Sequence, residues 1–199
     1  MIEPKNNDHF FVVSGGPGVG KTTLLNELAS RTFAVVPEIA RQLIIEQKGL
    51  DGEALPWKNK EAYKTMMFDR SIQRYEDVDK NASKDRPVFF DRGFLDSICY
   101  ATLIESEIDE RMTDYARKWR YNNKVFILPP WYEIYSKDNE RRQDWEEAML
   151  THRKMVSTYE EYGYEIVEVP KVSVQQRADF VLDQIKFKHD QSHIKRIRT

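Results

Sequence analysis

The chain has 199 residues, of which 40% are hydrophobic and 32% charged, and its formal net charge is −2. This length fits one domain with a substantial core, and the near-neutral charge gives no global argument for a nucleic-acid partner. Cys99 is the single cysteine, which excludes a disulfide framework or a cysteine metal site within one chain. No apolar run approaches the ~20 residues of a membrane span, and residues 1–9 lack the apolar core of a signal peptide, so we expect a cytoplasmic protein.

The first predicted strand, Phe10–Ser14, leads into a glycine-rich loop. The residues that follow it read GGPGVGKT, a complete match to the phosphate-binding pattern G-x-x-x-x-G-K-[ST]. A helix-forming run from Thr23 to Leu28 comes next. The loop therefore joins a strand to a helix start, as a P-loop does. The alternative is a tight strand-to-helix turn that is glycine-rich for structural reasons alone.

The residue types of this loop suit a nucleotide. Glycines let successive backbone N–H groups turn toward phosphate oxygens, and the helix N-terminus adds free N–H donors. Lys21 can reach the β- and γ-phosphates, and the Thr22 hydroxyl is a magnesium ligand. The pattern predicts ATP and Mg²⁺ as cofactors. The predicted nucleotide-binding residues are Gly15, Gly16, Pro17, Gly18, Val19, Gly20, Lys21, Thr22 and Thr23.

The second predicted strand, Phe33–Val36, ends at a proline and an acid. Ligands lie at the carboxyl ends of the strands in α/β sheets. Pro37 fits position N1 of a following helix, which predicts Glu38 in the first helical turn, as a base for an acceptor hydroxyl or a ligand of magnesium-bound water. Arg41, one turn later, could pair with Glu38 or bind substrate. The alternative for Glu38 is an acid that only complements the helix dipole.

Residues 49–56 contain glycine, aspartate and proline and are predicted to form an exposed loop. A helical pattern then runs from about Asn59 to Asp79, with Phe68, Ile72 and Tyr75 on one stripe. A stripe of this kind predicts packing against the core rather than a binding surface.

The third predicted strand, Val88–Asp91, ends in a candidate Walker B aspartate. The Asp91 carboxylate would hold Mg²⁺ opposite Thr22, directly or through water; the alternative is an N-cap for a helix beginning near Phe94. Arg92 follows, where mechanical ATPases usually carry a water-orienting glutamate. An arginine suits gripping a phosphoryl group or acceptor better than activating water, with a surface salt bridge as the alternative.

The fourth predicted strand, Val125–Leu128, is followed by aromatic residues and a charged run. We predict a lid at about residues 131–145, in which Arg141 and Arg142 close over the transferring phosphoryl group and offset its charge. A solvated helix face explains the same charges equally well. Trp131, Tyr132 and Tyr135 are expected to pack under the lid, with a stacking wall for a flat substrate as the alternative.

A helix over about residues 141–162 is predicted to end at Gly163, before the fifth strand, Tyr164–Val169. Ser173 and Gln176 then form the capping-box pattern of a last helix. The predicted domain spans residues 1–187. The basic tail, 188–199, is expected to be flexible and solvated, with an anionic lipid or RNA partner as the alternative.

Most of the five strand-like runs are almost continuously apolar, as in parallel strands covered on both faces, and all five alternate with helical patterns. Right-handed βαβ connections then predict a three-layer α/β/α sandwich with a five-stranded, mostly parallel sheet. The four histidines show no ligand spacing, which leaves structural zinc and a catalytic triad unsupported.

The segments FVVSGGPGVGKTTLL, VVPEIARQLI, ALPWK, VFFDRG, VFILPPW, ERRQDWEEA and GYEIVEVP together resemble the P-loop kinase-like group of AAA-domain proteins, which includes nicotinamide riboside kinase domains. More distantly, they resemble thymidylate and deoxynucleoside kinases. The resemblance implies a P-loop NTPase fold with a helical lid, a P-loop strand beside the aspartate-bearing strand, ATP as the nucleotide, and an adenine bordered by the loop after Val169. The resemblance also implies that Glu38 lies where nucleoside kinases have a catalytic carboxylate, and that Arg92 is the arginine of their phosphate-binding Asp-Arg pair. Arg141 and Arg142 correspond to residues of their lid.

These observations predict an ATP- and Mg²⁺-dependent phosphotransferase that acts on a small nucleoside- or nucleotide-like acceptor. A nucleotide-dependent switch, read by a protein or membrane partner, is the alternative. A polynucleotide end kinase would need a basic groove that a chain of charge −2 does not obviously provide. The predicted catalytic residues are Lys21, Glu38, Asp91, Arg92, Arg141 and Arg142.

Overall fold

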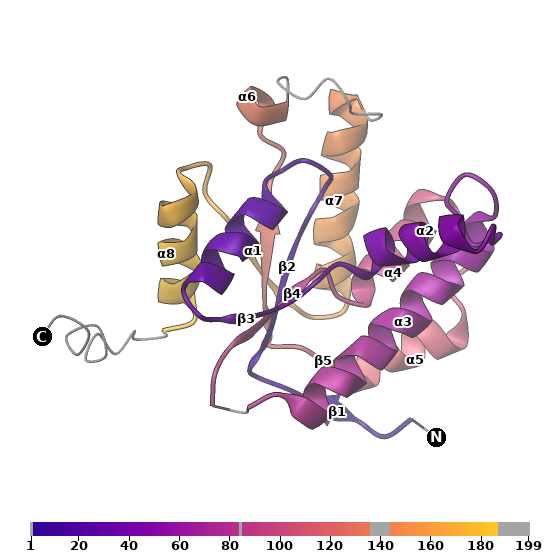
Figure 1. Cartoon of the computed structure of the whole chain (residues 1–199), viewed down its shortest axis with the longest axis horizontal. Coiled ribbons are helices and arrows are strands. Elements are labelled where there is room, and N and C mark those ends of the chain that lie inside the picture. Colours follow the sequence, from indigo (N-terminus) through magenta and orange to yellow (C-terminus); the bar gives the residue numbers. More distant parts are fainter. Residues whose placement is uncertain (1, 84, 136–143, 187–199) are drawn as a thin grey trace, which may run out of the picture.

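The computed structural model describes residues 2–83, 85–135 and 144–186 (Figure 1). Its centre is a five-stranded parallel sheet with the strand order β3-β4-β2-β6-β7. The predicted α/β fold with five strands is therefore confirmed, and every pairing in this sheet is parallel. The strands are β2 (Phe10–Gly15), β3 (Ala34–Val36), β4 (Val88–Asp91), β6 (Lys124–Leu128) and β7 (Glu165–Glu168).

Helices cover both faces of the sheet, as the continuous burial of β2 requires. One face carries α1 and α8, and the other carries α3, α4, α5 and α7 (Figure 1). The helices are α1 (Lys21–Ser30), α2 (Ile39–Gly49), α3 (Lys60–Asn81), α4 (Leu95–Leu103), α5 (Glu110–Lys118), α6 (Tyr132–Tyr135), α7 (Trp145–Glu161) and α8 (Val174–Gln184).

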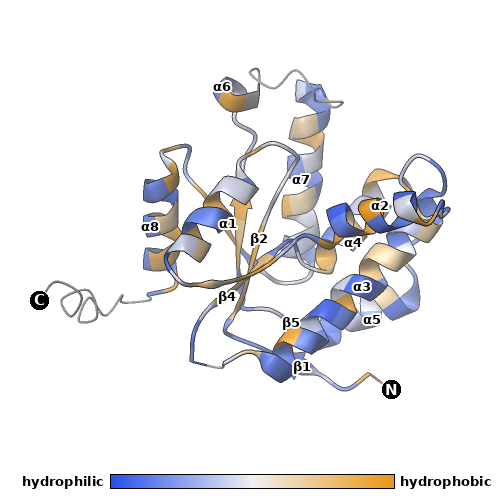
Figure 2. Ribbon diagram, viewed as in Figure 1, coloured by the Kyte–Doolittle hydropathy of each residue, from blue (hydrophilic) through white to orange (hydrophobic). Residues whose placement is uncertain are grey.

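The core consists of two large clusters, one on each side of the sheet. Phe10 and Val12 belong to the cluster under α3 and α7, whereas Phe11 and Val13 belong to the cluster under α1 and α8. This alternation follows from the period of two along a strand. In the hydropathy colouring, β4 is hydrophobic while α3 carries long hydrophilic stretches (Figure 2). The buried stripe of α3 is the one predicted from the sequence.

The register of the sheet determines which residues lie together at its carboxyl edge. Val13 of β2 is paired with Asp91 of β4, and Gly15 is paired with Leu128 of β6. The glycine-rich loop and the end of β4 are therefore neighbours at the carboxyl edge of the sheet, as the resemblance implied.

Several element boundaries match the predictions and others do not. Ser173 and Gln176 form a complete capping box, and Gly163 has a φ of 75° after α7. The helix predicted from residue 141 begins at Trp145 as α7. The predicted exposed loop, 49–56, buries Ala54 and Leu55. A two-stranded parallel sheet of β1 (Lys5–Asn6) and β5 (Trp119–Arg120) was not predicted.

Candidate active site

The loop between β2 and α1 has a backbone that only glycine adopts easily. Gly15, Gly18 and Gly20 have φ values of 145°, 69° and 90°. A Cβ on Gly15 would lie 2.7 Å from the carbonyl oxygen of Leu128. Glycine is therefore required here both for conformation and for close contact with β6. The loop opens directly onto the N-terminus of α1, which begins at Lys21.

Lys21 folds back over this loop. Its buried Nζ donates hydrogen bonds to the carbonyl oxygens of Gly15, at 2.9 Å, and Gly16, at 3.0 Å. Burial, together with the positive charge of Arg92, lowers the pKa of Lys21 to about 8. A phosphate beside Nζ would favour the charged form, so this lysine is well placed to respond to an anion.

Asp91 carries an unsatisfied oxygen at the end of β4. Its Oδ1 is buried and has no hydrogen-bond partner in the described part of the chain, and burial raises the pKa of the carboxyl group. A buried carboxylate oxygen without a hydrogen-bond partner is unusual in a folded protein. Coordination to a hard cation, or a hydrogen bond from its bound water, would satisfy this oxygen. Asp91 does not cap the next helix, since the N-cap of α4 is Phe94. The residues present thus fit Mg²⁺, which Thr22 and Asp91 would hold.

Arg92 connects two carboxylates. Its backbone φ is 70°, its Nε donates to Glu38 Oε1 at 2.6 Å, and its Nη1 donates to Asp96 Oδ1 at 3.0 Å. Burial alone would lower the pKa of Arg92, but the charges of Asp96 and Glu38 raise it above its usual value. The side chain is only 19% exposed, so the salt bridges that Arg92 makes are partly buried rather than on the surface.

Glu38 does not lie in the first turn of α2, as the sequence predicted. It is the N-cap residue, with φ −58° and ψ 127°, and α2 begins at Ile39. Its side chain caps no helical N–H, because the carboxylate is turned toward Arg92 instead. The considered pairing of Glu38 with Arg41 is replaced by this contact.

One cavity of about 240 Å³ brings the candidate residues together. Thr22 and Asp91, the candidate magnesium ligands, line it beside Glu38 and Arg41. The cavity lies between α1 and α2, and its remaining lining residues are Leu25, Asn26, Val35, Pro37, Gln42 and Ile45. A phosphate donor at the loop and an acceptor near Glu38 would meet here.

The sequence matches the family model of an AAA domain over residues 10–177. The chain belongs to the AAA-domain family. Among solved structures it is similar to NadR protein in complex with NR, with 19% identity, a TM-score of 0.68 and coverage of 93% of this chain and 54% of that one. The chain thus spans about half of the NadR chain. No curated protein matches the sequence.

Two smaller kinases share the fold over nearly their whole length. Thymidylate kinase from Candida albicans has 14% identity and a TM-score of 0.61, with 90% of this chain and 92% of that chain covered. Deoxyadenosine kinase from M. mycoides has 15% identity and a TM-score of 0.57, with 89% and 98% covered. At this identity the similarity establishes the P-loop kinase fold of this AAA domain.

Asp96 is a site residue of the AAA domain that the sequence reasoning missed. Its Oδ1 accepts hydrogen bonds from the Ser14 hydroxyl and from Arg92. Its Oδ2 accepts from the backbone N–H of Gly93, at 2.9 Å, and from the Tyr159 hydroxyl, at 2.6 Å. This buried acid fixes the Arg92 guanidinium from behind. The available signal was a lone acid in the apolar run Leu95-Asp96-Ser97-Ile98-Cys99, since a charged residue in such a run is buried only with partners.

The predicted lid falls only in part on described residues. Arg141 and Arg142, with the rest of 136–143, lie outside them, as does the tail, 188–199. Tyr132 is 61% exposed and meets the Trp145 ring edge-on, with centroids 5.3 Å apart.

Within the described ranges, no group of three or more His, Cys, Asp or Glu residues could hold a metal ion. No described helix is long and apolar enough to cross a membrane.

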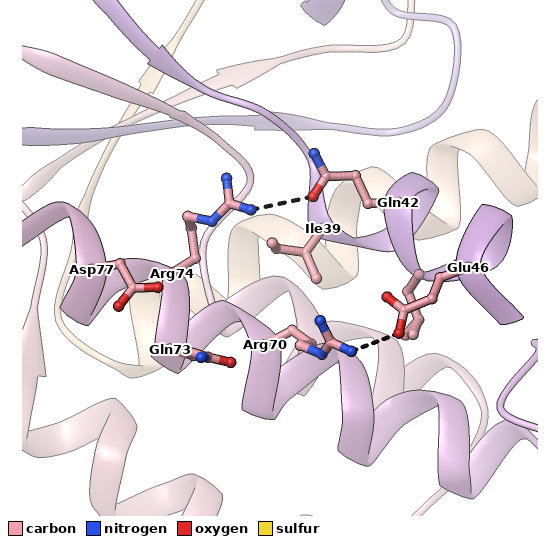
Figure 3. A pocket seen from close by; sticks show the side chains of 8 residues that line it. Ile39, Gln42, Glu46, Arg70, Gln73, Arg74 and Asp77 are labelled. Atoms are coloured by element: carbon pink, nitrogen blue, oxygen red, sulfur yellow. Dashed lines mark hydrogen bonds and ion pairs between the residues drawn. The ribbon is translucent and has the colours of Figure 1, made fainter.

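A second cavity, of about 170 Å³, lies between α2 and α3 (Figure 3). Arg70 Nη2 donates to Glu46 at 2.8 Å, and Arg74 Nη2 donates to Gln42 at 3.3 Å across it. These contacts tie α2 to α3. They therefore help to place Glu38, which precedes α2, at the edge of the sheet.

Proposed function

We propose that this AAA domain is an ATP- and Mg²⁺-dependent phosphotransferase that acts on a hydroxyl group of a small nucleoside- or nucleotide-like acceptor. The observation that carries the proposal is the position of Glu38. Its carboxylate lines one cavity with Thr22 and Asp91 and is held by Arg92 at 2.6 Å. A base beside the phosphate end of a P-loop suits transfer to an acceptor.

In the proposed reaction, the loop amides and Lys21 hold the triphosphate of ATP. Thr22 and Asp91 would hold Mg²⁺, which would offset negative charge on the phosphates. Arg92, whose raised pKa keeps it charged, stabilises charge on the γ-phosphoryl group. Arg141 and Arg142 would add positive charge from the lid. The work of the protein is positioning and electrostatics.

Glu38 acts as the base. Arg92 Nε occupies Oε1 of its carboxylate, so Oε2 accepts the proton of the acceptor hydroxyl. The acceptor oxygen forms a bond to the γ-phosphorus as the bond from that phosphorus to the β–γ bridging oxygen breaks. ADP leaves, and the acceptor carries the phosphoryl group. Arg41, on the same cavity wall, would bind the acceptor.

The class of acceptor rests on the structural neighbours. These include NadR in complex with NR, deoxyadenosine kinase and thymidylate kinase. Their named ligands and activities favour a nucleoside or nucleotide for this AAA domain. The cavity at Glu38 holds about 240 Å³, which suits a sugar hydroxyl region better than a polymer.

The test is phosphate transfer from radiolabelled Mg·ATP to a panel of nucleosides, nucleotides and nucleoside-like vitamins. We expect a labelled product with at least one of them, and none with the Glu38→Gln variant. ATP binding without transfer to any acceptor would contradict the proposal. Acceptor-independent hydrolysis would instead favour a nucleotide-dependent switch.

A further inference from the structure

Arg177 on α8 is a buried cation with no acidic partner among the described residues. Its residue is 7% exposed, and its Nε is buried and makes no hydrogen bond to any residue in the described ranges. No ion pair joins its guanidinium to a described carboxylate. Burial lowers the pKa of Arg177. A buried unpaired charge costs free energy, so its retention calls for a reason beyond packing.

A second arginine at the interface between α1 and α8 does have acidic partners. Arg31, at the end of α1, forms ion pairs with Glu27, at 2.9 Å, and with Asp179 of α8. Asp179 lies two residues from Arg177, but its carboxylate accepts from Arg31 Nη1. The interface between α1 and α8 thus pairs Arg31 with two carboxylates and gives Arg177 no carboxylate partner among the described residues.

Arg177 is positioned against the glycine-rich loop. α8 lies beside α1 (Figure 1), and a Cβ on Gly20 would lie only 2.8 Å from Arg177 Nη1. On its other side, Arg177 Cζ lies 5.8 Å from the centroid of the Trp131 ring, just after β6. Gly20 is the N-cap of α1, so the guanidinium lies next to the positive end of a helix dipole. Two adjacent positive features attract an anion.

We propose that Arg177 is a nucleotide-binding residue that contacts the α-phosphate end of the triphosphate. This inference rests on the proposed function, in which the γ-phosphate end faces Glu38 and Arg92. These residues follow β3 and β4, on one side of β2, whereas Arg177 follows β7, on the other side. Glycine at position 20 leaves the room that the guanidinium occupies.

The proposal predicts two effects of opposite sign in Arg177→Met. The free variant melts at a higher temperature than the wild type, because a buried unpaired charge is removed and the volume is kept. Its affinity for nucleotide falls by about tenfold to a hundredfold, the usual loss for a charge-assisted hydrogen bond to phosphate. The loss is the same for Mg·ATP and Mg·ADP, because both carry the α-phosphate.

The experiment measures the thermal midpoint of the free protein and the Kd for Mg·ATP and Mg·ADP by calorimetry. Arg31→Met is the matched control, an arginine at the same helix interface. We expect it to lower the thermal midpoint and leave both Kd values unchanged. Arg177→Lys, which keeps the charge, should bind nucleotide with an affinity between those of wild type and Arg177→Met.

Unchanged Kd values in Arg177→Met would overturn the inference, and so would a lower thermal midpoint or a failure to fold, since either would make Arg177 a structural residue. A loss for ATP but not for ADP would overturn its assignment to the α-phosphate end. These results leave the proposed function intact, because the wild type still binds nucleotide. A wild type that binds neither nucleotide would remove the proposed function and this inference together.

Discussion

The guanidinium of Arg92 and the carboxylate of Glu38 join the ends of β4 and β3, with Nε and Oε1 2.6 Å apart. This contact makes Glu38 an N-cap residue that caps nothing. The contact uses only one of the two carboxylate oxygens of Glu38. The pair thus sets a carboxylate and a positive charge side by side at the edge of the sheet.

Glu38→Gln is expected to lower kcat by about 10²- to 10⁴-fold, the usual contribution of a general base. The amide oxygen still accepts from Arg92, so the fold and the Kd for Mg·ATP should change little. Steady-state transfer assays and calorimetry separate the two effects. Equal losses in kcat and in ATP affinity would show that Glu38 serves nucleotide binding rather than the acceptor.

Asp96→Asn is expected to destabilise the protein by about 3 kcal/mol, because it removes a buried charge from beneath Arg92 and sets an amide N–H₂ against existing donors. Chemical denaturation measures this loss. Ser14→Ala removes one of the hydrogen bonds to Asp96 and should cost about 1 kcal/mol. A larger effect from Ser14→Ala than from Asp96→Asn would contradict the central place given to Asp96.

The pKa of Lys21, lowered to about 8 by burial and Arg92, predicts opposite pH trends for stability and binding. Between about 8 and its ordinary value of 10.5, the unfolded chain binds one proton more than the folded one, so the free energy of unfolding rises with pH. The affinity for ATP falls over the same range, because the charged lysine is lost. Thermal midpoints measure the trend in stability, and calorimetric Kd values measure the trend in ATP affinity. Lys21→Met is the control, and both pH trends that come from Lys21 should be absent in it.

Asp91→Asn is expected to raise the Mg²⁺ concentration needed for half-maximal activity by at least about tenfold, since a carboxylate ligand becomes neutral. The free protein should be as stable as wild type or more so, because Oδ1 is buried without a hydrogen-bond partner among described residues. A magnesium titration of transfer activity, with denaturation curves beside it, gives both quantities. An unchanged magnesium requirement would remove Asp91 from the metal site.

The parts of the fold that could be predicted are those that local pattern determines. Runs of β-branched and aromatic residues, most of them almost continuously apolar, identified all five strands of the central sheet, and Ser173 with Gln176 identified the start of α8. β1 and β5 could not be found this way, because strands of two residues have no periodicity. Pro37 suggested a helix start two residues too early, since α2 begins at Ile39 and the contact of Glu38 with Arg92 leaves Glu38 at the N-cap.

The same distinction holds for the candidate site. The glycine-rich loop and Asp91 could be predicted because the residues next to them in the sequence form recognisable motifs. Asp96 meets Ser14 and Tyr159 across 82 and 63 residues of sequence, and only the assembled sheet brings them together. Arg177 gave no signal of its own, because the absence of a partner is visible only in the folded chain.

The most direct test of the account is a calorimetric titration of the protein with Mg·ATP. We expect saturable binding that is lost, or weakened by at least about a hundredfold, in Lys21→Ala. No heat of binding, or equal affinity in Lys21→Ala, would contradict the claim that the loop between β2 and α1 holds a triphosphate.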